Sequence, residues 1–272
     1  DRGAQVVVRH AFPPNWSPPE KGRWVHIQPW EFGYLPIDWI PPLRDFVDEI
    51  WVPSNYVRDV YLRSGIPPHK IQVMPWGIEP DLYTPSAPPL HLPTSKQFRF
   101  LFVGGTIERK GFDVLLEAYL HEFTRGEDVC LVVKDIGVNT FYRFGNHRDR
   151  IQQLIASGSG PEILYYDQEL SDGLRASLYT ACHCVVAPYR GEGFGLPILE
   201  GMACGLPAVV PRGGPTDDFT SEESAFYLPA REVECHHDWP LYGTARQLSV
   251  EVADVRRAMR EAFENSPATK RK

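Results

Sequence analysis

The sequence has little that would suit a membrane or a nucleic acid. No apolar run approaches the ~20 residues that a bilayer-spanning helix needs, and the start shows no signal-peptide pattern. The formal net charge is −7, and no long basic stretch precedes the tail at residues 270–272. A nucleic-acid surface would need a concentrated positive face. We therefore expect a soluble, cytoplasmic protein with no transmembrane segment and no nucleic-acid partner.

Cysteine is scarce as well, and the five cysteines do not follow a disulfide pattern. Their odd number and mostly apolar surroundings favour buried thiols in a reducing compartment. Two clusters have zinc-ligand residue types, Cys-His-Cys at 182–184 and Cys-His-His at 235–237. The first alternates along a predicted strand and the second suits a polar loop, whereas structural zinc needs four ligands in recognisable pairs. Since there is also no Asp-x-Asp cluster, we expect no metal site.

Strands and helices alternate from residue 98 onward. Short apolar runs, typical of parallel strands buried on both faces, occur at 98–103, 129–133, 162–166, 184–187, 208–210 and 225–228. Helical patterns lie between them at 112–123, 142–156, 172–181 and from about Pro197. This order predicts an α/β fold with a doubly wound parallel sheet. Its ligands should bind beyond the carboxyl ends of the strands, in the loops after Val103, Val133 and Ala187.

The first 90 residues form a less complete pattern. They contain predicted strands at 5–8, 24–28, 49–52 and 71–74, and one clear helix between Ser54 and Arg63. This is about half of a domain with the nucleotide-binding fold type, so we expect further strand–helix units upstream of residue 1 and poor activity of this chain alone. We assign residues 1–90 to a partial N-terminal Rossmann-like domain and 91–272 to a second domain, with a proline-rich linker near 75–94.

The most informative stretch is EGFGLPILE, which runs from Glu192 to Glu200. Pro197 suits the first turn of a helix, and Gly205 stands where a C-terminal cap would lie. Glu192 then lies in a glycine loop before the helix, and Glu200 lies within the first turns. Free N–H groups at a helix start bind phosphate, while carboxylates accept hydrogen bonds from hydroxyls. A ligand that is half anion and half polyol, such as a sugar nucleotide, satisfies both.

This stretch resembles the E-x7-E motif of the retaining glycosyltransferases of family 4, which have the GT-B architecture. Further matches are GGTIERKG at 104–111, ACGLPAVV at 203–210 and GGP at 213–215. The resemblance covers nearly all of 98–228 and, more loosely, 5–80. It implies a GT-B fold, in which residues 1–90 are the C-terminal part of an acceptor-binding domain and residues 91–272 bind the nucleotide-sugar donor. It also implies the transfer of a sugar, with retention, from a UDP- or GDP-linked donor to a saccharide, lipid or protein acceptor. It implies neither a metal nor a cofactor.

The resemblance also implies roles for particular residues. Lys110 and Arg109 should contact the diphosphate, although the family's arginine position is Gly105 here. Glu200 should bind the ribose hydroxyls and Glu192 should lie near the donor sugar. The catalytic candidates are Lys110, Glu192 and His10. The donor-binding candidates are Gly104, Gly105, Thr106, Arg109, Lys110, Gly193, Phe194, Gly195, Leu196 and Glu200.

Other interpretations of these residues remain open. Arg109 and Lys110 also suit an ordinary basic helix start, and His10 at a strand end also suits a cap or a core position. The aromatic segment at 29–34 suits sugar stacking or, somewhat better, domain packing. By position alone, Lys134 and Asp135 are candidates for lining the nucleotide pocket. Two alternative functions also stay open, namely a sugar-nucleotide epimerase of the same architecture and a binding module without turnover.

Overall fold

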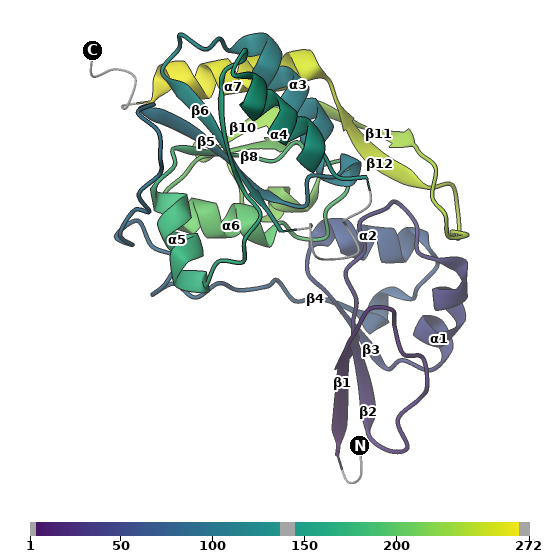
Figure 1. The fold of residues 1–272 in the computed structure, drawn as a ribbon. Coiled ribbons are helices and arrows are strands. Elements are labelled where there is room, and N and C mark those ends of the chain that lie inside the picture. Colours follow the sequence, from purple (N-terminus) through teal and green to yellow (C-terminus); the bar gives the residue numbers. More distant parts are fainter. Residues whose placement is uncertain (1–3, 137–144, 267–272) are drawn as a thin grey trace.

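The structure is a computed structural model that describes residues 4–136 and 145–266. Strands in these ranges form a four-stranded, a six-stranded and a two-stranded sheet (Figure 1). The four-stranded sheet is parallel in the order β1-β2-β3-β4. Its strands are β1 (Val6–His10), β2 (Arg23–Ile27), β3 (Glu49–Val52) and β4 (Ile71–Val73).

The six-stranded sheet is also parallel, in the order β10-β9-β8-β5-β6-β7. Its strands are β5 (Phe98–Gly104), β6 (Val129–Asp135), β7 (Glu162–Tyr166), β8 (Cys184–Val186), β9 (Ala208–Pro211) and β10 (Ala225–Leu228). The chain builds outward from β5 to β7 and then returns to the other side of β5. The strand order thus reverses between β5 and β8, which opens a crevice at their carboxyl ends. The doubly wound sheet expected from the sequence is confirmed.

Helices cover both faces of this sheet. α3 (Phe112–Glu122), α4 (Arg148–Ser157) and α7 (Val252–Asn265) share one core with the sheet. α5 (Asp172–Thr180) and α6 (Leu196–Ala203) share the core on the opposite face. Strand β6 is buried at every position because both of its faces are covered. None of the helices in the described ranges is long and apolar enough to cross a bilayer.

The four-stranded sheet has a core of its own, built around Trp24, Trp30, Trp39 and Tyr61. Helices α1 (Ile40–Asp45) and α2 (Asn55–Arg63) belong to this part of the molecule. As expected, Ser54 caps α2, and its hydroxyl accepts a hydrogen bond from the Val57 N–H. The sequence-based boundary between residues 90 and 91 stays a prediction.

The two-stranded sheet is an antiparallel hairpin of β11 (Ala230–Glu234) and β12 (Arg246–Val250). It extends from the six-stranded part to the four-stranded part (Figure 1). Three backbone hydrogen bonds of 2.9–3.0 Å attach it there, and they join Gly33 N to Arg246 O, Ile37 N to Pro240 O, and Tyr242 N to Leu35 O. Position 33 must be glycine, because a Cβ there would lie 2.7 Å from the Arg246 Cβ.

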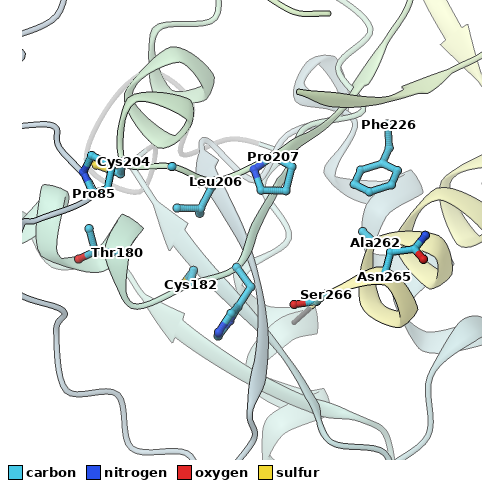
Figure 2. A pocket seen from close by; sticks show the side chains of 12 residues that line it. Pro85, Thr180, Cys182, Cys204, Leu206, Pro207, Phe226, Ala262, Asn265 and Ser266 are labelled. Carbon is cyan, nitrogen blue, oxygen red and sulfur yellow. The ribbon is translucent and has the colours of Figure 1, made fainter. Parts of the chain in front are cut away.

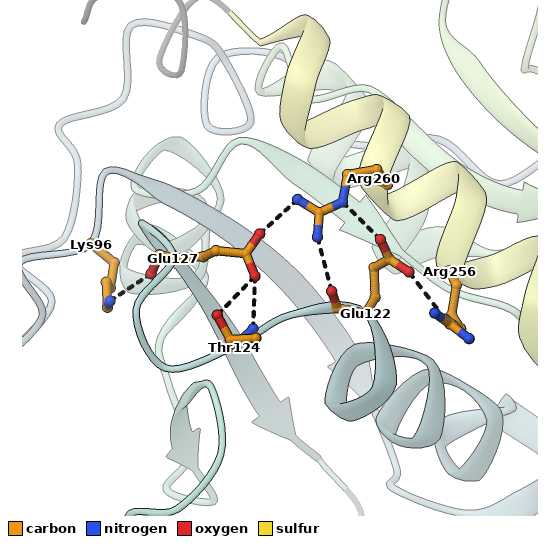
Figure 3. Close-up of polar contacts among 6 residues, drawn as sticks. All are labelled: Lys96, Glu122, Thr124, Glu127, Arg256 and Arg260. Atoms are coloured by element: carbon orange, nitrogen blue, oxygen red, sulfur yellow. Dashed lines mark hydrogen bonds and ion pairs between the residues drawn. The ribbon is translucent and has the colours of Figure 1, made fainter.

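Two expectations need correction. The helix expected at 142–156 begins at Arg148; residues 142–144 lie outside the described ranges, and Gly145 has a left-handed φ of 73°, which no helix interior adopts. The set of elements does not end with the strand at 225–228, since the hairpin and α7 follow it. Helix α7 is fixed to the end of α3 by charged side chains (Figure 3). Arg256 and Arg260 both donate to the carboxylate of Glu122, and Arg260 also reaches Glu127.

Candidate functional site

The two loops at the strand-order reversal meet through Lys110 and Glu192. Lys110 ends a short 3-10 helix after β5, and Glu192 lies in the loop after β8. The Lys110 Nζ donates to the Glu192 Oε2. Burial favours the neutral form of Glu192, but the charges of Lys110 and Arg109 outweigh it and hold the pKa of this carboxyl below its usual value. The expected cation and the first motif carboxylate are therefore adjacent.

Helix α6 begins close to this pair, as the motif predicts. Gly195 is its N-cap with a left-handed φ of 97°, Leu196 is its first residue and Pro197 its second. Gly205, with a φ of 90°, follows its end. Both motif carboxylates thus belong to one loop–helix unit, and the free N–H groups of α6 lie at the same end of the sheet as Lys110.

Glu200 is buried inside a set of polar side chains. It is 6 % exposed, and the hydroxyl of Tyr179 donates to its Oε2 at 3.0 Å. The Arg175 Nε lies 3.9 Å from the same oxygen and donates to the hydroxyl of Tyr83 at 3.0 Å. Burial raises the pKa of Glu200, and the neighbouring Arg175 only partly offsets this. The sequence did not identify Arg175, Tyr179 or Tyr83; only the spacing of Arg175 and Tyr179 along α5 could have indicated them.

The glycines before α6 allow close contact with the other half of the molecule. A Cβ on Gly191 would lie 2.7 Å from the Glu31 carbonyl oxygen, and one on Gly193 would lie 3.1 Å from the Pro29 Cβ. The carbonyl of Gly193 accepts a 2.8 Å hydrogen bond from the Ser54 hydroxyl, while its N–H donates to the Glu192 Oε1 at 3.1 Å. Small residues are thus required here by the adjoining chain.

Phe194, which lies between Gly193 and Gly195, is also in close contact with neighbouring residues. It is buried, and its ring packs against Trp76 and Phe219 at centroid distances of 5.8 and 5.4 Å. Its side chain is therefore a packing element, and only its backbone is available to a ligand.

The loop after β5 is held by Asp135. Its Oδ2 accepts hydrogen bonds from the Thr106 hydroxyl at 2.8 Å and from the Tyr165 hydroxyl at 2.9 Å. Gly104, Gly105 and Thr106 are all buried in this arrangement. Lys134 is buried too, which lowers the pKa of its ammonium, and its Nζ donates to the Asp135 carbonyl at 2.8 Å. Lys134 and Asp135, the two pocket candidates named by position alone, thus both help to shape the loop after β5.

Arg109 points toward the four-stranded part. Its guanidinium donates to the Gly191 carbonyl at 2.8 Å and lies 3.5 Å from the Glu31 carboxylate. It lines a cavity of about 840 Å³ together with the exposed His10, which ends β1. His10 and Arg109 come from different sheets, so this cavity lies between the two halves. Whether Arg109 substitutes for the family arginine stays a prediction.

The two Cys-His clusters lie in different surroundings. Within the cluster at 182–184, Cys182 and Cys184 are buried, and burial raises the pKa of the Cys182 thiol to about 12. In the hairpin loop, His237 packs against Phe32 at 4.4 Å, and His236 lies 3.3 Å from Asp238. No group of three or more potential metal ligands occurs in residues 4–136 and 145–266.

A second cavity, of about 500 Å³, lies elsewhere (Figure 2). Cys182, Pro207 and Asn265 line it. The first two precede β8 and β9, so this cavity is at the amino ends of the strands, opposite the loops of Lys110 and Glu192. It is therefore separate from the candidate site.

Comparisons with known proteins agree with this geometry. Residues 97–235, just over half of the chain, match the family described as "Glycosyl transferases group 1". The chain belongs to this family. Curated members include a D-inositol 3-phosphate glycosyltransferase of Arthrobacter sp., 30 % identical over 149 residues, which are 53 % of this chain and 34 % of that protein. The O-antigen chain mannosyltransferase B of Escherichia coli is 34 % identical over 135 residues, 47 % of this chain and 33 % of that one.

Solved glycosyltransferase structures share the fold. A glycosyltransferase from Rickettsia africae superposes with a TM-score of 0.67 at 16 % identity, covering 99 % of this chain and 69 % of that one. Anabaena HepE, solved with UDP and glucose, gives a TM-score of 0.62 at 14 % identity over 91 % of this chain and 64 % of that one. The GT-B fold expected from the sequence is thereby confirmed. The matched stretch is about a third of the two curated relatives above.

The part of this glycosyltransferase that matches the family, residues 97–235, includes one wall of the crevice but not the other. Lys110, Glu192 and Glu200 lie inside residues 97–235, whereas His10 and Trp239 lie outside them. The family assignment thus concerns mainly the wall on the six-stranded sheet. The opposite wall must be interpreted from its own residues.

Proposed function

We propose that this protein moves a sugar from a nucleoside-diphosphate donor to an acceptor hydroxyl, with retention at the anomeric carbon and without a metal ion. The observation that carries the proposal is the Lys110–Glu192 contact next to the start of α6, with Glu200 in the same helix. This arrangement offers fixed positive charge for a diphosphate and a carboxylate for the ribose hydroxyls. Family membership and the UDP-bound neighbour support it.

In this reaction the leaving group, the nucleoside diphosphate, needs the most stabilisation. The bond from the anomeric carbon to the phosphate oxygen breaks, and its electron pair stays with the nucleoside diphosphate. The acceptor hydroxyl oxygen forms the new bond to that carbon, and its proton passes to the departing phosphate. Charge that develops on the diphosphate is stabilised most by fixed cations and N–H groups. In our proposal, Lys110 exchanges Glu192 for the diphosphate, and Glu192 turns to the donor sugar.

Substitution of Lys110 tests the donor site. We expect UDP or GDP to bind in calorimetric titration and Lys110→Ala to weaken binding at least about tenfold, about 1.4 kcal/mol, because one fixed charge is lost. Lys21→Ala is the control, since it removes the same charge from an exposed position at the far end of β2. Equal affinities of Lys110→Ala and Lys21→Ala would contradict the proposal, as would binding of neither nucleotide.

A radiolabelled donor assay in the presence of EDTA then separates the remaining functions. A glycosyltransferase leaves the sugar nucleotide largely unchanged until an acceptor is added, whereas an epimerase converts it alone. A binding module retains the nucleotide and transfers nothing to any acceptor in a broad screen. The anomeric configuration of the product, read by NMR, tests retention.

A further inference from the structure

The cavity between the two halves has walls of unusual composition. One wall follows the carboxyl ends of β1 and β2 and includes His10 and Gln28, and the opposite wall is the hairpin loop around Trp239. The cavity adjoins the candidate donor loop, because Glu31 in its wall contacts Gly191. The hairpin is also attached there, through a 2.8 Å bond from the Leu248 N–H to the Arg190 carbonyl.

Three aromatic rings pack together at this cavity. Phe12 and Trp239 are stacked, with centroids 5.7 Å apart and planes inclined by 8°. Trp239 and Trp30 follow at 6.1 Å and 19°. Trp30 is buried, but Trp239 is 39 % exposed and Phe12 is 59 % exposed. Aromatic faces carry partial negative charge, so they attract the C–H groups on the face of a pyranose ring.

A buried amide lies in the same wall. Gln28 is 3 % exposed, and its side-chain Oε1 has no hydrogen-bond partner among the residues that the structure describes. A buried acceptor left unpaired destabilises the site, so a donor supplied by a ligand would bind favourably there. The carboxylates of Glu31 and Asp238 also line the cavity. These oxygens and the Gln28 Oε1 are acceptors, which suit the hydroxyl groups of a ligand.

The cavity has no surplus of positive charge, because Arg109 faces Glu31 and the second carboxylate, Asp238, faces an imidazole that is charged only when protonated. Glu31 lies 3.5 Å from Arg109, and Asp238 lies 3.3 Å from His236. A neutral ligand therefore fits better than a phosphorylated one. A lipid chain would bring its methylene groups against these carboxylates, which is costly. A ligand with hydroxyl edges and apolar C–H faces satisfies the amide, the carboxylates and the rings together.

We propose that this cavity binds a neutral oligosaccharide, and that this saccharide is the acceptor. The inference rests on the proposed glycosyl transfer. One sugar ring packs on Phe12 and Trp239, and one hydroxyl donates to the Gln28 Oε1. The next ring extends toward the glycine loop, where its hydroxyl oxygen forms the bond to the anomeric carbon and its proton leaves with the nucleoside diphosphate.

The first experiment uses the full chain on an array of neutral mannans, glucans, galactans and rhamnans of two to five residues. We expect at least one series to bind, with transfer of magnetisation to its ring protons in saturation-transfer NMR. Absence of binding to every series overturns the inference. Binding instead to phosphatidylglycerol vesicles, with no glycan bound, also overturns it and indicates a lipid acceptor.

Variants then locate the bound saccharide. Trp239→Ala should weaken the saccharide at least tenfold in calorimetry, while Trp239→Phe, which keeps a stacking face, should stay within about threefold of the unsubstituted chain. Tyr242→Ala is the matched control, since Tyr242 is a 51 % exposed aromatic of the same hairpin loop and does not line the cavity. Equal affinities of Trp239→Ala and Tyr242→Ala would contradict the proposed stacking.

Gln28→Leu separates binding from folding. The change removes the unpaired acceptor and also the 3.2 Å bond from the Gln28 Nε2 to the Pro29 carbonyl, so saccharide affinity should fall about tenfold while the thermal midpoint changes little. Undiminished saccharide affinity in this variant overturns the role of the amide. UDP and GDP titrations of the same samples keep the two proposals apart. Nucleotide binding without glycan binding rejects only the acceptor site, and glycan binding without nucleotide binding rejects the donor site.

Discussion

The surroundings of Glu200 shift its pKa in opposite directions. Burial raises its pKa, while the Arg175 guanidinium 3.9 Å away and the hydroxyls of Tyr179 and Tyr83 lower it by a smaller amount. The net result is a carboxyl whose pKa lies above its ordinary value. A protonated carboxyl has less capacity to accept hydrogen bonds than a carboxylate, so its ionisation should control the binding of the ribose.

This gives a prediction for pH dependence. As pH falls through the raised pKa of Glu200, the unsubstituted chain should lose nucleotide affinity more steeply than Glu200→Gln, which has no proton to gain. The ratio of the two affinities, measured by calorimetry between pH 4.5 and 8, cancels the titration of the nucleotide's own phosphates. Tyr227→Phe, which removes a hydroxyl bonded to Thr220, is the control and should follow the unsubstituted chain. A constant ratio across the range would refute the assigned role.

At the scale of residues, the sequence predicted those parts of the site whose contacts are local in the chain. Glu192, Glu200 and the start of α6 were predicted from one short stretch with its proline and glycines. Tyr83 was not, because its contact with Arg175 joins residues 92 positions apart. The cavity between Gln28 and the hairpin loop was missed for the same reason. Cavities between distant segments leave no local pattern in the chain.

At the scale of elements, two omissions have different causes. Helix α7 did leave a signal, since Val252, Val255, Met259 and Phe263 recur at helical spacing and pack on the core. The hairpin left almost none. Its residues are half-buried or exposed apart from Leu248 and Val250 of β12, and the loop joining the strands has no two-residue turn pattern. The hairpin is held by contacts with both halves of the molecule.

The attachment of α7 to α3 can be measured. Glu122→Gln should lower the free energy of unfolding by about 1–2 kcal/mol in urea, because Arg256 and Arg260 both lose their carboxylate partner (Figure 3). Arg257→Gln is the control, since the Arg257 side chain is 67 % exposed and its ion pair with Asp254 should contribute less than about 0.5 kcal/mol. Similar losses in both variants would show that the network adds nothing beyond a surface pair.

At the scale of the whole molecule, α2 connects the two halves near the glycine loop. The Ser54 hydroxyl caps α2 and donates to the Gly193 carbonyl, while Asn55 donates to Asp218 through both its backbone and its amide at 2.8 and 3.1 Å. The same buried hydroxyl thus caps α2 and holds the glycine loop. The position of the glycine loop thus depends on a residue of the other half.

Ser54→Ala and Ser171→Ala should separate capping from this connection. Both serines are N-caps, of α2 and α5, and each alanine variant should lose about 1 kcal/mol of stability. Ser54→Ala should in addition weaken nucleotide binding about three- to tenfold, because the Gly193 carbonyl loses its donor. Thermal melts and calorimetry on both proteins provide the comparison. Equal nucleotide affinities would mean that the connection does not position the loop.

The hairpin has a mechanical consequence. In the described residues the chain passes from one half to the other after β4, and β11–β12 joins the halves again on the opposite side (Figure 1). Separating the halves on that side would break the backbone bonds from Gly33 to Arg246 and from Ile37 to Pro240. Helix α2 adds a third connection, at the glycine loop. A wide opening of the crevice therefore requires at least one of these connections to release.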